Sequence, residues 1–446
     1  MADVAIVGGG ISGLATAWFA RRRGLSVIVL EAEGEVGGTI RSTMRDDFLI
    51  EAGPTSTLSR GGALDELIEA LEIGFEVMEA DRRVRRYIVR HDRLVPLPMG
   101  PGRFLLSSLF SVGAKLRVLG EPFRRPLRQE ESIAQFVRRR LGPEILDWAV
   151  DPFVSGVYAG DPERLSLREA LPRLHMLEVE HGSLIVGALR HGRGGESGAQ
   201  PRGRLIAFHR GMQVLPNALA RALGDAVHTG APVQRIAARD GSWLLATPEG
   251  EHLARRAVLA LPAYRAAALL APLDRELAET LDFIHYPPVA SVALGFERGQ
   301  VGHRLDGFGA LFPRRLGRET LGVIFSSSLF PGRAPDGAVL LTAFIGGTRN
   351  PGIREREPAE LIERVLADLR PLLRIRGEPV LRQATLWPKA IPQYELGYGE
   401  RLARIDAGAA RWPGLYLAGN WRGGVSLADS VANAARLAAR LAQPHP

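Results

Sequence analysis

Cysteine is absent from this chain of 446 residues. Its absence excludes disulfide bonds, thiolate metal ligands, cysteine nucleophiles and cofactors attached through a thiol. The ten histidines show no pair at a spacing typical of metal ligands, so we assign no metal site. No apolar run reaches the roughly 18 residues of a membrane-spanning helix. The N-terminus also lacks the basic region and apolar core of a secretory signal.

Lysine is almost as scarce, because Lys115 and Lys389 are the only two in the chain. Most of the positive charge behind the net value of +8 therefore comes from arginine. A solvated basic surface, contact with an acidic membrane, or an anionic substrate would each account for this charge. The arginines are scattered and form no recognised nucleic-acid motif, so no nucleic acid partner is expected. The length predicts two or three domains.

Residues 4–30 have the pattern of a strand, a glycine turn, a helix and a second strand. The apolar run 4–7 is typical of a buried parallel strand, and the helical composition of residues 14–23 ends at Gly24. Residues 27–30 form the second strand. The segment therefore predicts a βαβ unit.

The turn of this unit has the spacing G-x-G-x-x-G, formed by Gly8, Gly10 and Gly13. The first glycine permits the tight turn, the second lets a pyrophosphate approach the backbone, and the third lets helix and strand pack closely. Glu31, at the end of the second strand, can accept hydrogen bonds from a ribose. A glycine turn without a ligand is the alternative, but the strand, helix and acidic residue favour a dinucleotide site.

A second glycine pair, Gly37 and Gly38, follows Glu31 closely and precedes Arg41. This pair is not part of the dinucleotide fingerprint, and it suits a chain that passes close to a long flavin dinucleotide. The stretches "VGGGISGL", "VIVLEAEGEVGGTIRS" and "EAGPTS" resemble the FAD-binding segment of the flavin amine oxidase superfamily.

Four further stretches narrow the resemblance to the oxygen-dependent protoporphyrinogen and coproporphyrinogen oxidases of haem biosynthesis: residues 151–166, 332–350, 387–398 and 419–430. The resemblance implies an FAD-dependent oxidoreductase that oxidises protoporphyrinogen IX to protoporphyrin IX, with O₂ as acceptor and H₂O₂ as product. Oxidation of coproporphyrinogen III is the alternative within this family. A flavin amine oxidase, a polyene desaturase and a non-catalytic lipid- or prenyl-binding relative are the more distant alternatives.

The resemblance implies non-covalent FAD as the cofactor. Residues expected to contact FAD come from both ends of the chain and two segments between them: Gly8, Gly9, Gly10, Ile11, Ser12, Gly13, Leu14, Glu31, Ala32, Gly38, Thr39, Arg41, Gly53, Pro54, Thr55, Ser56, Val233, Trp387, Gly419, Val425, Ser426 and Leu427.

The resemblance also implies a tetrapyrrole slot lined by an arginine, two glycines and three apolar residues: Arg86, Gly156, Gly160, Leu311, Ile324 and Phe344. Arg86 is expected to pair with a propionate, because a guanidinium binds a carboxylate through two parallel hydrogen bonds. A solvated arginine face is the alternative for Arg86, and an ordinary core position is the alternative for the apolar residues. No catalytic side chain is assigned, since the flavin accepts the electrons.

The expected fold class is α/β, with a discontinuous Rossmann-like FAD-binding domain of parallel sheet and β-meander. That domain comprises residues 1–60, 205–265 and 400–446. Residues 270–395 form a mixed-sheet substrate-binding domain, residues 75–195 a mostly helical domain, and residues 191–204 a mobile loop.

Tetrapyrrole and O₂ are the expected small-molecule partners, and a homodimer and a downstream ferrochelatase are the candidate protein partners. Residues 98–128 mix apolar helix with basic residues, which suits either a membrane-surface helix or a helix that caps the slot. The expected location is the cytoplasm, including the inner face of the cell membrane.

The glycine-rich stretch 419–434 near the chain's end is the last feature assigned. Its glycines are expected to bring backbone against the flavin ring, followed by a helix from about Ala428 whose positive end points there. Trp421 and Arg422 depart from the family's usual pattern in this stretch.

Overall fold

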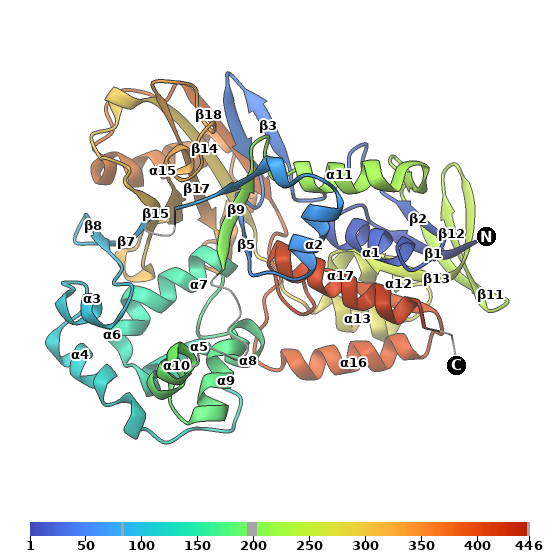
Figure 1. Cartoon of the computed structure of the whole chain (residues 1–446), viewed down its shortest axis with the longest axis horizontal. Coiled ribbons are helices and arrows are strands. Elements are labelled where there is room, and N and C mark those ends of the chain that lie inside the picture. Colours follow the sequence, from blue (N-terminus) through green and yellow to red (C-terminus); the bar gives the residue numbers. More distant parts are fainter. Residues whose placement is uncertain (82–83, 194–202, 444–446) are drawn as a thin grey trace.

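A computed structural model describes residues 1–81, 84–193 and 203–443. Three parts are visible in Figure 1: a sheet with α1 and α17 on the right, a second sheet with α15 at the upper left, and helices α3 to α10 at the lower left. Residues 194–202 of the predicted mobile loop 191–204 lie outside the described residues.

The first sheet is parallel at its centre and antiparallel at one end. Its strands run in the order β10 (Val227–His228), β2 (Val27–Leu30), β1 (Ala2–Val7), β13 (Gly250–Ala260), β12 (Ser242–Thr247) and β11 (Arg235–Arg239), and β19 (Leu415–Ala418) pairs with β13. The apolar runs of β1 and β2 explain their central place, because strands covered on both faces exclude water from both sets of side chains.

Helices cover this sheet on both faces. They are α1 (Ile11–Arg21), α11 (Val214–Leu223), α12 (Ala263–Leu270), α13 (Arg275–Asp282), α16 (Tyr398–Ala410) and α17 (Leu427–Leu441). Helix α1, which follows β1 directly, packs against α17 from the far end of the chain. The N- and C-terminal segments therefore share one core.

The second sheet is mixed. Its order is β18 (Leu381–Trp387), β14 (Val289–Glu297), β17 (Ala338–Gly346), β16 (Thr320–Ile324), β15 (Gly307–Leu311), β7 (Arg85–Arg90) and β8 (Arg93–Pro96). Helix α15 (Pro358–Leu373) covers one face, and α14 (Ser326–Leu329) follows β16. Residues 85–96, which have the pattern of short strands within the segment 75–195 assigned to the helical domain, form β7 and β8 and extend this sheet.

The helical part consists of α3 (Pro101–Leu106), α4 (Val112–Leu119), α5 (Ile133–Arg140), α6 (Pro143–Ile145), a π-helical turn (Leu146–Val150), α7 (Asp151–Tyr158), α8 (Leu167–Ala170), α9 (Pro172–His181) and α10 (Leu184–Arg193). A buried ion network joins these helices: Arg140 Nη1 lies 3.0 Å from Glu121 Oε1, and Arg140 Nε donates to Glu178 Oε1 at 2.7 Å. Such charges are tolerated in the interior because each one is paired.

Two small sheets connect the parts. One pairs β3 (Ser42–Arg45) with β4 (Phe48–Glu51), and the other has the order β5 (Thr57–Ser59), β9 (Arg204–Phe208) and β6 (Val77–Glu79); α2 (Ala63–Ala70) follows β5. The expected α/β class, with a parallel sheet plus meander, a mixed sheet and a helical part, is confirmed. Among the described residues, no helix combines the length and apolar character needed to cross a bilayer.

Candidate functional site

The turn between β1 and α1 has the shape needed to receive an anion. Gly8 has a φ of +107°, and a Cβ added at Gly13 would lie 1.9 Å from the Gly8 carbonyl oxygen. A Cβ at Gly10 would meet nothing within 4 Å, so open space lies there. Helix α1 has no side-chain cap at its N-terminus, which leaves its first N–H groups and its positive dipole end available to a phosphate.

Glu31 is held against this turn. Its carboxylate accepts hydrogen bonds from the backbone N–H of Gly9 at 2.5 Å and of Glu33 at 2.9 Å, and the residue is 8% exposed. Its backbone carbonyl accepts from the N–H of Ala231, which brings the loop that carries Val233 to the same edge of the sheet. The structure therefore gathers the candidate ribose and adenine contacts at the carboxyl ends of β1, β2 and β10.

The second glycine pair closes over the first turn. The N–H of Gly37 donates to the Gly9 carbonyl oxygen at 2.9 Å, and a Cβ added at Gly38 would lie 3.6 Å from the Gly10 Cα. Arg41 Nε donates to the Gly38 carbonyl oxygen at 3.1 Å. A Cβ at Gly53 would lie 1.9 Å from the Thr39 carbonyl oxygen, so the stretch 53–56 packs on this loop. The two glycine clusters predicted from sequence thus form one cradle.

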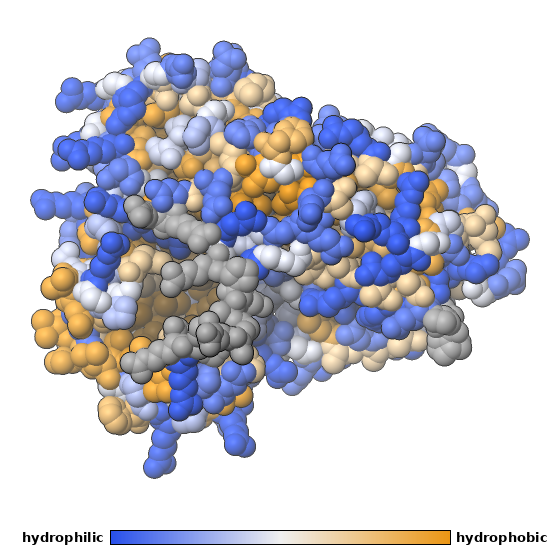
Figure 2. All heavy atoms as spheres, viewed as in Figure 1, coloured by the Kyte–Doolittle hydropathy of each residue, from blue (hydrophilic) through white to orange (hydrophobic). Residues whose placement is uncertain are grey.

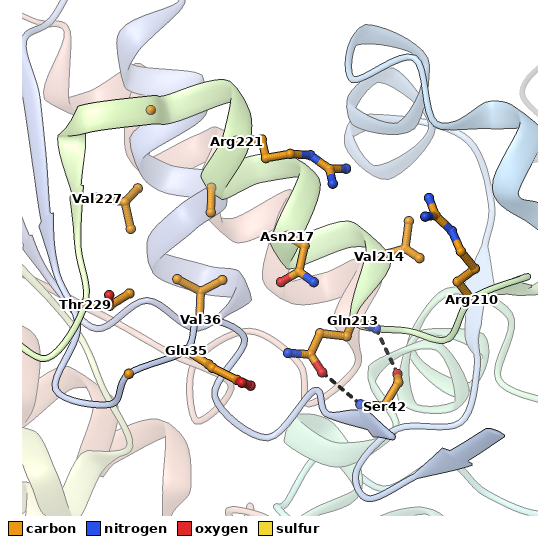
Figure 3. Close-up of a pocket in the computed structure, with 13 residues that line it drawn as sticks. Glu35, Val36, Ser42, Arg210, Gln213, Val214, Asn217, Arg221, Val227 and Thr229 are labelled. Atoms are coloured by element: carbon orange, nitrogen blue, oxygen red, sulfur yellow. Dashed lines mark hydrogen bonds between the residues drawn. The ribbon is translucent and has the colours of Figure 1, made fainter. Parts of the chain in front are cut away.

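A groove of about 740 Å³ lies beside this cradle, between α11 and the loop 34–42, and none of the predicted site residues lines it. Figure 3 shows Gln213 and Ser42 joined across its floor by two hydrogen bonds. Ser42 N donates to Gln213 Oε1 at 2.9 Å, and Gln213 N donates to Ser42 Oγ at 3.1 Å. These bonds fix the loop that carries the second glycine pair.

The candidate substrate residues share one face of the second sheet. Leu311 pairs with Gly322, which pairs with Phe344, and Ile324 is two residues further along its strand. Arg86 pairs with Gly309, two residues before Leu311. Because paired residues in neighbouring strands point to the same side, Arg86, Leu311, Ile324 and Phe344 all face away from α15. Each of the three apolar residues is only half-buried.

Arg86 and its neighbour Arg85 point to opposite faces. Arg85 lies 3.2 Å from Asp306, on the α15 side with Tyr87. The guanidinium of Arg86 instead lies 5.5 Å from the ring centre of Phe308, and no carboxylate among the described residues pairs with it. Phe308 is a residue that the sequence analysis missed, since a lone phenylalanine in a strand has the pattern of a core residue.

Helix α7 faces the same space with an apolar surface. Phe153, Gly156 and Val157 are exposed, and a Cβ added at Gly156 would lie 2.4 Å from Leu311 Cδ2. Gly160 does not follow them: it is buried, and a Cβ there would lie 2.5 Å from Gln393 Oε1. The structure therefore places Gly156 beside the candidate substrate residues but puts Gly160 in the interior.

A buried ion pair fixes α7 to the second sheet. Arg349 donates to Asp151 Oδ2 at 2.9 Å, to Ser155 Oγ at 2.6 Å and to the Phe312 carbonyl oxygen at 2.7 Å. Burial raises the pKa of Asp151, although the positive charge of Arg349 opposes this shift. The first turn of α7 is thus attached to the ends of β15 and β17.

Trp387 joins the second sheet to the cradle. It pairs with Val289 at the end of β18, and its indole N–H donates to the Ala52 carbonyl oxygen at 2.8 Å. Ala52 immediately precedes the candidate FAD stretch 53–56. The apolar sheet face and the glycine cradle therefore border each other.

The C-terminal candidates lie where β19 meets α17. Gly419 directly follows β19 and has a φ of +148°, and Ser426 caps α17 by accepting a hydrogen bond from Asp429 N at 3.1 Å. Val425 packs partly on the core, and Leu427 is buried in the core that α1 and α17 share. Helix α17 begins one residue before the predicted start at Ala428.

Comparison with known proteins agrees with this arrangement. The family model "Flavin containing amine oxidoreductase" matches residues 11–442. The chloroplastic protoporphyrinogen oxidase of Oryza sativa subsp. japonica is 36% identical over 99% of this chain and 88% of its own length. The coproporphyrinogen III oxidase of Bacillus subtilis (strain 168) is 29% identical over 96% of this chain and 95% of its own. A crystal structure from Exiguobacterium sp. 255-15, provisionally assigned as a protoporphyrinogen oxidase, is 27% identical, covers 98% of both chains and has a TM-score of 0.86.

These likenesses define the class: the chain belongs to the flavin-containing amine oxidoreductases, and it is an FAD-dependent oxidoreductase. Within that class it is a member of the porphyrinogen oxidase family, as the resemblance in its sequence predicted.

Proposed function

We propose that this chain oxidises a porphyrinogen in haem biosynthesis, converting protoporphyrinogen IX to protoporphyrin IX. The observation that carries the proposal is the apolar sheet face beside the glycine cradle, with Arg86 at its rim, whose guanidinium pairs with no carboxylate in the described part of the chain. A porphyrinogen is a broad apolar ring with anionic propionates, and this surface matches both features. The relatives named above are oxidases of such substrates.

The residues of the cradle fit FAD. The open space at Gly10, the uncapped start of α1 and the carboxylate of Glu31 suit a pyrophosphate followed by a ribose. The candidate FAD residues given above, from Gly8 to Leu427, would hold the cofactor. When bound, FAD supplies the chemistry by accepting electron pairs from the substrate.

The chain's own residues bind and orient the substrate. Arg86 pairs with a propionate, and Phe308 beneath it keeps the guanidinium in place. Leu311, Ile324 and Phe344 cover one side of the tetrapyrrole and exclude water from it. Gly156 leaves room for the ring beside α7.

The overall reaction balances without a base from the protein. Three oxidations remove six electrons and six protons from the porphyrinogen, and three O₂ molecules take them up as three H₂O₂. Of the six hydrogens, four leave the meso carbons and two leave the pyrrole nitrogens, and those that leave as protons pass to solvent.

Coproporphyrinogen III is the second candidate substrate, because a relative at 29% identity carries that name. It differs from protoporphyrinogen IX in having two further propionates in place of vinyl groups. The deciding experiment compares the oxidation of both porphyrinogens by the purified protein, followed through porphyrin fluorescence. Faster oxidation of coproporphyrinogen III would replace the main proposal, and oxidation of neither would refute both.

The same assay tests Arg86. We expect R86A to raise KM by about 10-fold to 100-fold with FAD content unchanged, since a hydrogen bond to a charged group contributes about 1.5–3 kcal/mol. R85A is the matched control, because Arg85 faces Asp306 on the opposite side of the sheet. Equal effects of the two substitutions would contradict the role of Arg86.

We also propose that residues 98–128 contact a membrane surface. Figure 2 shows an apolar region at the lower left, over α3 and α4. Leu106 there is 90% exposed and Phe123 is 91% exposed, with Lys115 and Arg117 nearby in sequence. Co-sedimentation with vesicles of anionic phospholipid tests this proposal, and binding that survives L106S/F123S would contradict it. The homodimer, the ferrochelatase partner and the cytoplasmic location remain predictions.

A further inference from the structure

The loop 419–426 has little conformational freedom. Gly419, Gly423 and Gly424 have φ values of +148°, +72° and +121°. A Cβ at Gly419 would lie 2.7 Å from Trp421 Nε1, and one at Gly424 would lie 2.5 Å from Asp429 Oδ2. The loop therefore follows one tight path between β19 and α17.

Side chains from outside this loop hold three successive carbonyl groups of its backbone. The Asn420 carbonyl accepts from the Tyr394 hydroxyl at 2.5 Å, and the Trp421 carbonyl accepts from the Tyr398 hydroxyl at 2.6 Å. The Arg422 carbonyl accepts from Asn433 Nδ2 at 2.7 Å. Tyr394, Tyr398 and Asn433 lie in stretches that the sequence analysis named, but none of the three was assigned a role there.

Tyr394 contacts both limbs of the loop. Its hydroxyl donates to the Asn420 carbonyl and accepts from the Gly424 N–H at 3.1 Å, so one oxygen joins the two ends of the turn. Tyr394 is 3% exposed, and its ring stacks on that of Tyr398, with centroids 4.6 Å apart and planes at 27°. Burial raises the pKa of Tyr394, so the hydroxyl stays neutral and performs both roles.

We propose that Tyr394 is a positioning residue that holds loop 419–426 in the shape that presents its backbone to the flavin. This inference rests on the proposed placement of FAD against residues 425–427. The same tyrosine is tied to the substrate side, because its carbonyl accepts from Ser166 N at 2.8 Å and the adjacent Gln393 donates to the Tyr158 carbonyl of α7 at 2.8 Å. Segment 387–398 therefore connects α7 to the loop.

The test is Tyr394→Phe in the full-length protein, with Tyr286→Phe as the matched control. Tyr286 is similarly buried and its hydroxyl also accepts a backbone N–H, that of Ala263, and no hydrogen bond among the described residues joins its hydroxyl to the loop. Three quantities are measured: amide hydrogen exchange of residues 419–426 in the FAD-free protein, the dissociation constant of FAD, and the midpoint potential of the bound flavin. Hydrogen exchange needs neither FAD nor porphyrinogen, so it separates a failure of this inference from a failure of the proposed function.

We expect Y394F to speed exchange at Gly424 at least 10-fold, to weaken FAD binding about 10-fold and to shift the midpoint potential, while Y286F changes none of these. Tyr398→Phe, which frees only the Trp421 carbonyl, should give a smaller effect. Unchanged exchange and FAD affinity in Y394F would overturn the proposal. Global unfolding of Y394F while Y286F stays folded would also overturn it, because the role of Tyr394 would then be purely structural.

Discussion

Gly156 offers the sharpest test of the substrate site, because a single methyl group added there meets one defined atom. The Cβ of Gly156→Ala would lie 2.4 Å from Leu311 Cδ2, whereas Leu311 Cγ is 3.8 Å away and Cδ1 is 4.0 Å away. Carbon atoms prefer separations of about 3.5–4.0 Å, so the Cδ2 methyl must move by about 1.1–1.6 Å. A rotation of the Leu311 side chain achieves this, and we expect it to move the methyl over the sheet face that Leu311 shares with Ile324 and Phe344.

Two effects on stability oppose each other in G156A. Overpacking lowers the free energy of unfolding by about 1–3 kcal/mol, and replacement of glycine by alanine inside α7 raises it by about 1 kcal/mol. The melting temperature should therefore change by only a few degrees. The effect on kcat/KM should be larger, a loss of about 10-fold, because the displaced methyl occupies room that the tetrapyrrole needs.

The assay is a double-mutant cycle of G156A and Leu311→Ala, with kcat/KM for the preferred porphyrinogen and FAD content measured for each protein. L311A removes the methyl that clashes, so G156A should have almost no further effect in that background. An equal loss in both backgrounds would show that the clash is not the cause. Unaltered kcat/KM in the single variant G156A would refute the position of Gly156 at the slot.

Three further predictions concern the cradle and the buried charges. Gly13→Ala should yield colourless protein that does not retain FAD, since its Cβ would lie 1.9 Å from a backbone oxygen; a yellow protein with normal FAD affinity would contradict the tight turn. Arg349→Met should lower stability by about 3–5 kcal/mol in denaturant unfolding, because it leaves Asp151 buried without its cation, and Asp151→Asn in the same chain should restore most of the loss. Burial acts to raise the pKa of Glu178, but hydrogen bonds and charges from Arg139 and Arg140 outweigh it and lower that pKa below its ordinary value of 4.5. The Glu178 carboxylate therefore contributes fully to the stability of the fold above about pH 4.5, and this contribution is lost as the pH falls further. The melting temperature of Glu178→Gln should consequently vary less between pH 5 and pH 3 than that of the unaltered protein.

The cradle could be predicted from the sequence because its constraints are local. Gly8, between a strand and a helix, is needed for its positive φ, and Gly13 is needed because the helix packs closely on the turn. The spacing of the three glycines in the sequence indicates both requirements. The candidate substrate residues on β15, β16 and β17 came from resemblance, and their common face follows from the strand register. That register cannot be read from any one strand.

Gly160, a candidate that came from the resemblance, shows how the end of a helix changes the position of a residue. Glycines four residues apart lie on the same face of a helix, so Gly156 and Gly160 would both face the slot if α7 continued. The helix instead ends at Tyr158, and Ala159 turns the chain with a φ of +50°. Gly160 is therefore directed into the interior against Gln393. The position of Gly160 is therefore set by where α7 ends and not by the residue type.

The segment 387–398, one of the stretches that carry the family resemblance, links three other parts of the molecule. Trp387 donates to the backbone beside the candidate FAD stretch 53–56, Gln393 donates to the end of α7, and Tyr394 bonds both limbs of the loop 419–426. These contacts span the cradle, the slot and the C-terminal loop. A change in the position of α7 would act on Gln393, which is bonded to it, and through the adjacent Tyr394 on the hydrogen bonds that hold the loop. Hydrogen bonds from one short stretch of chain thus join the glycine cradle, the end of α7 and the C-terminal loop.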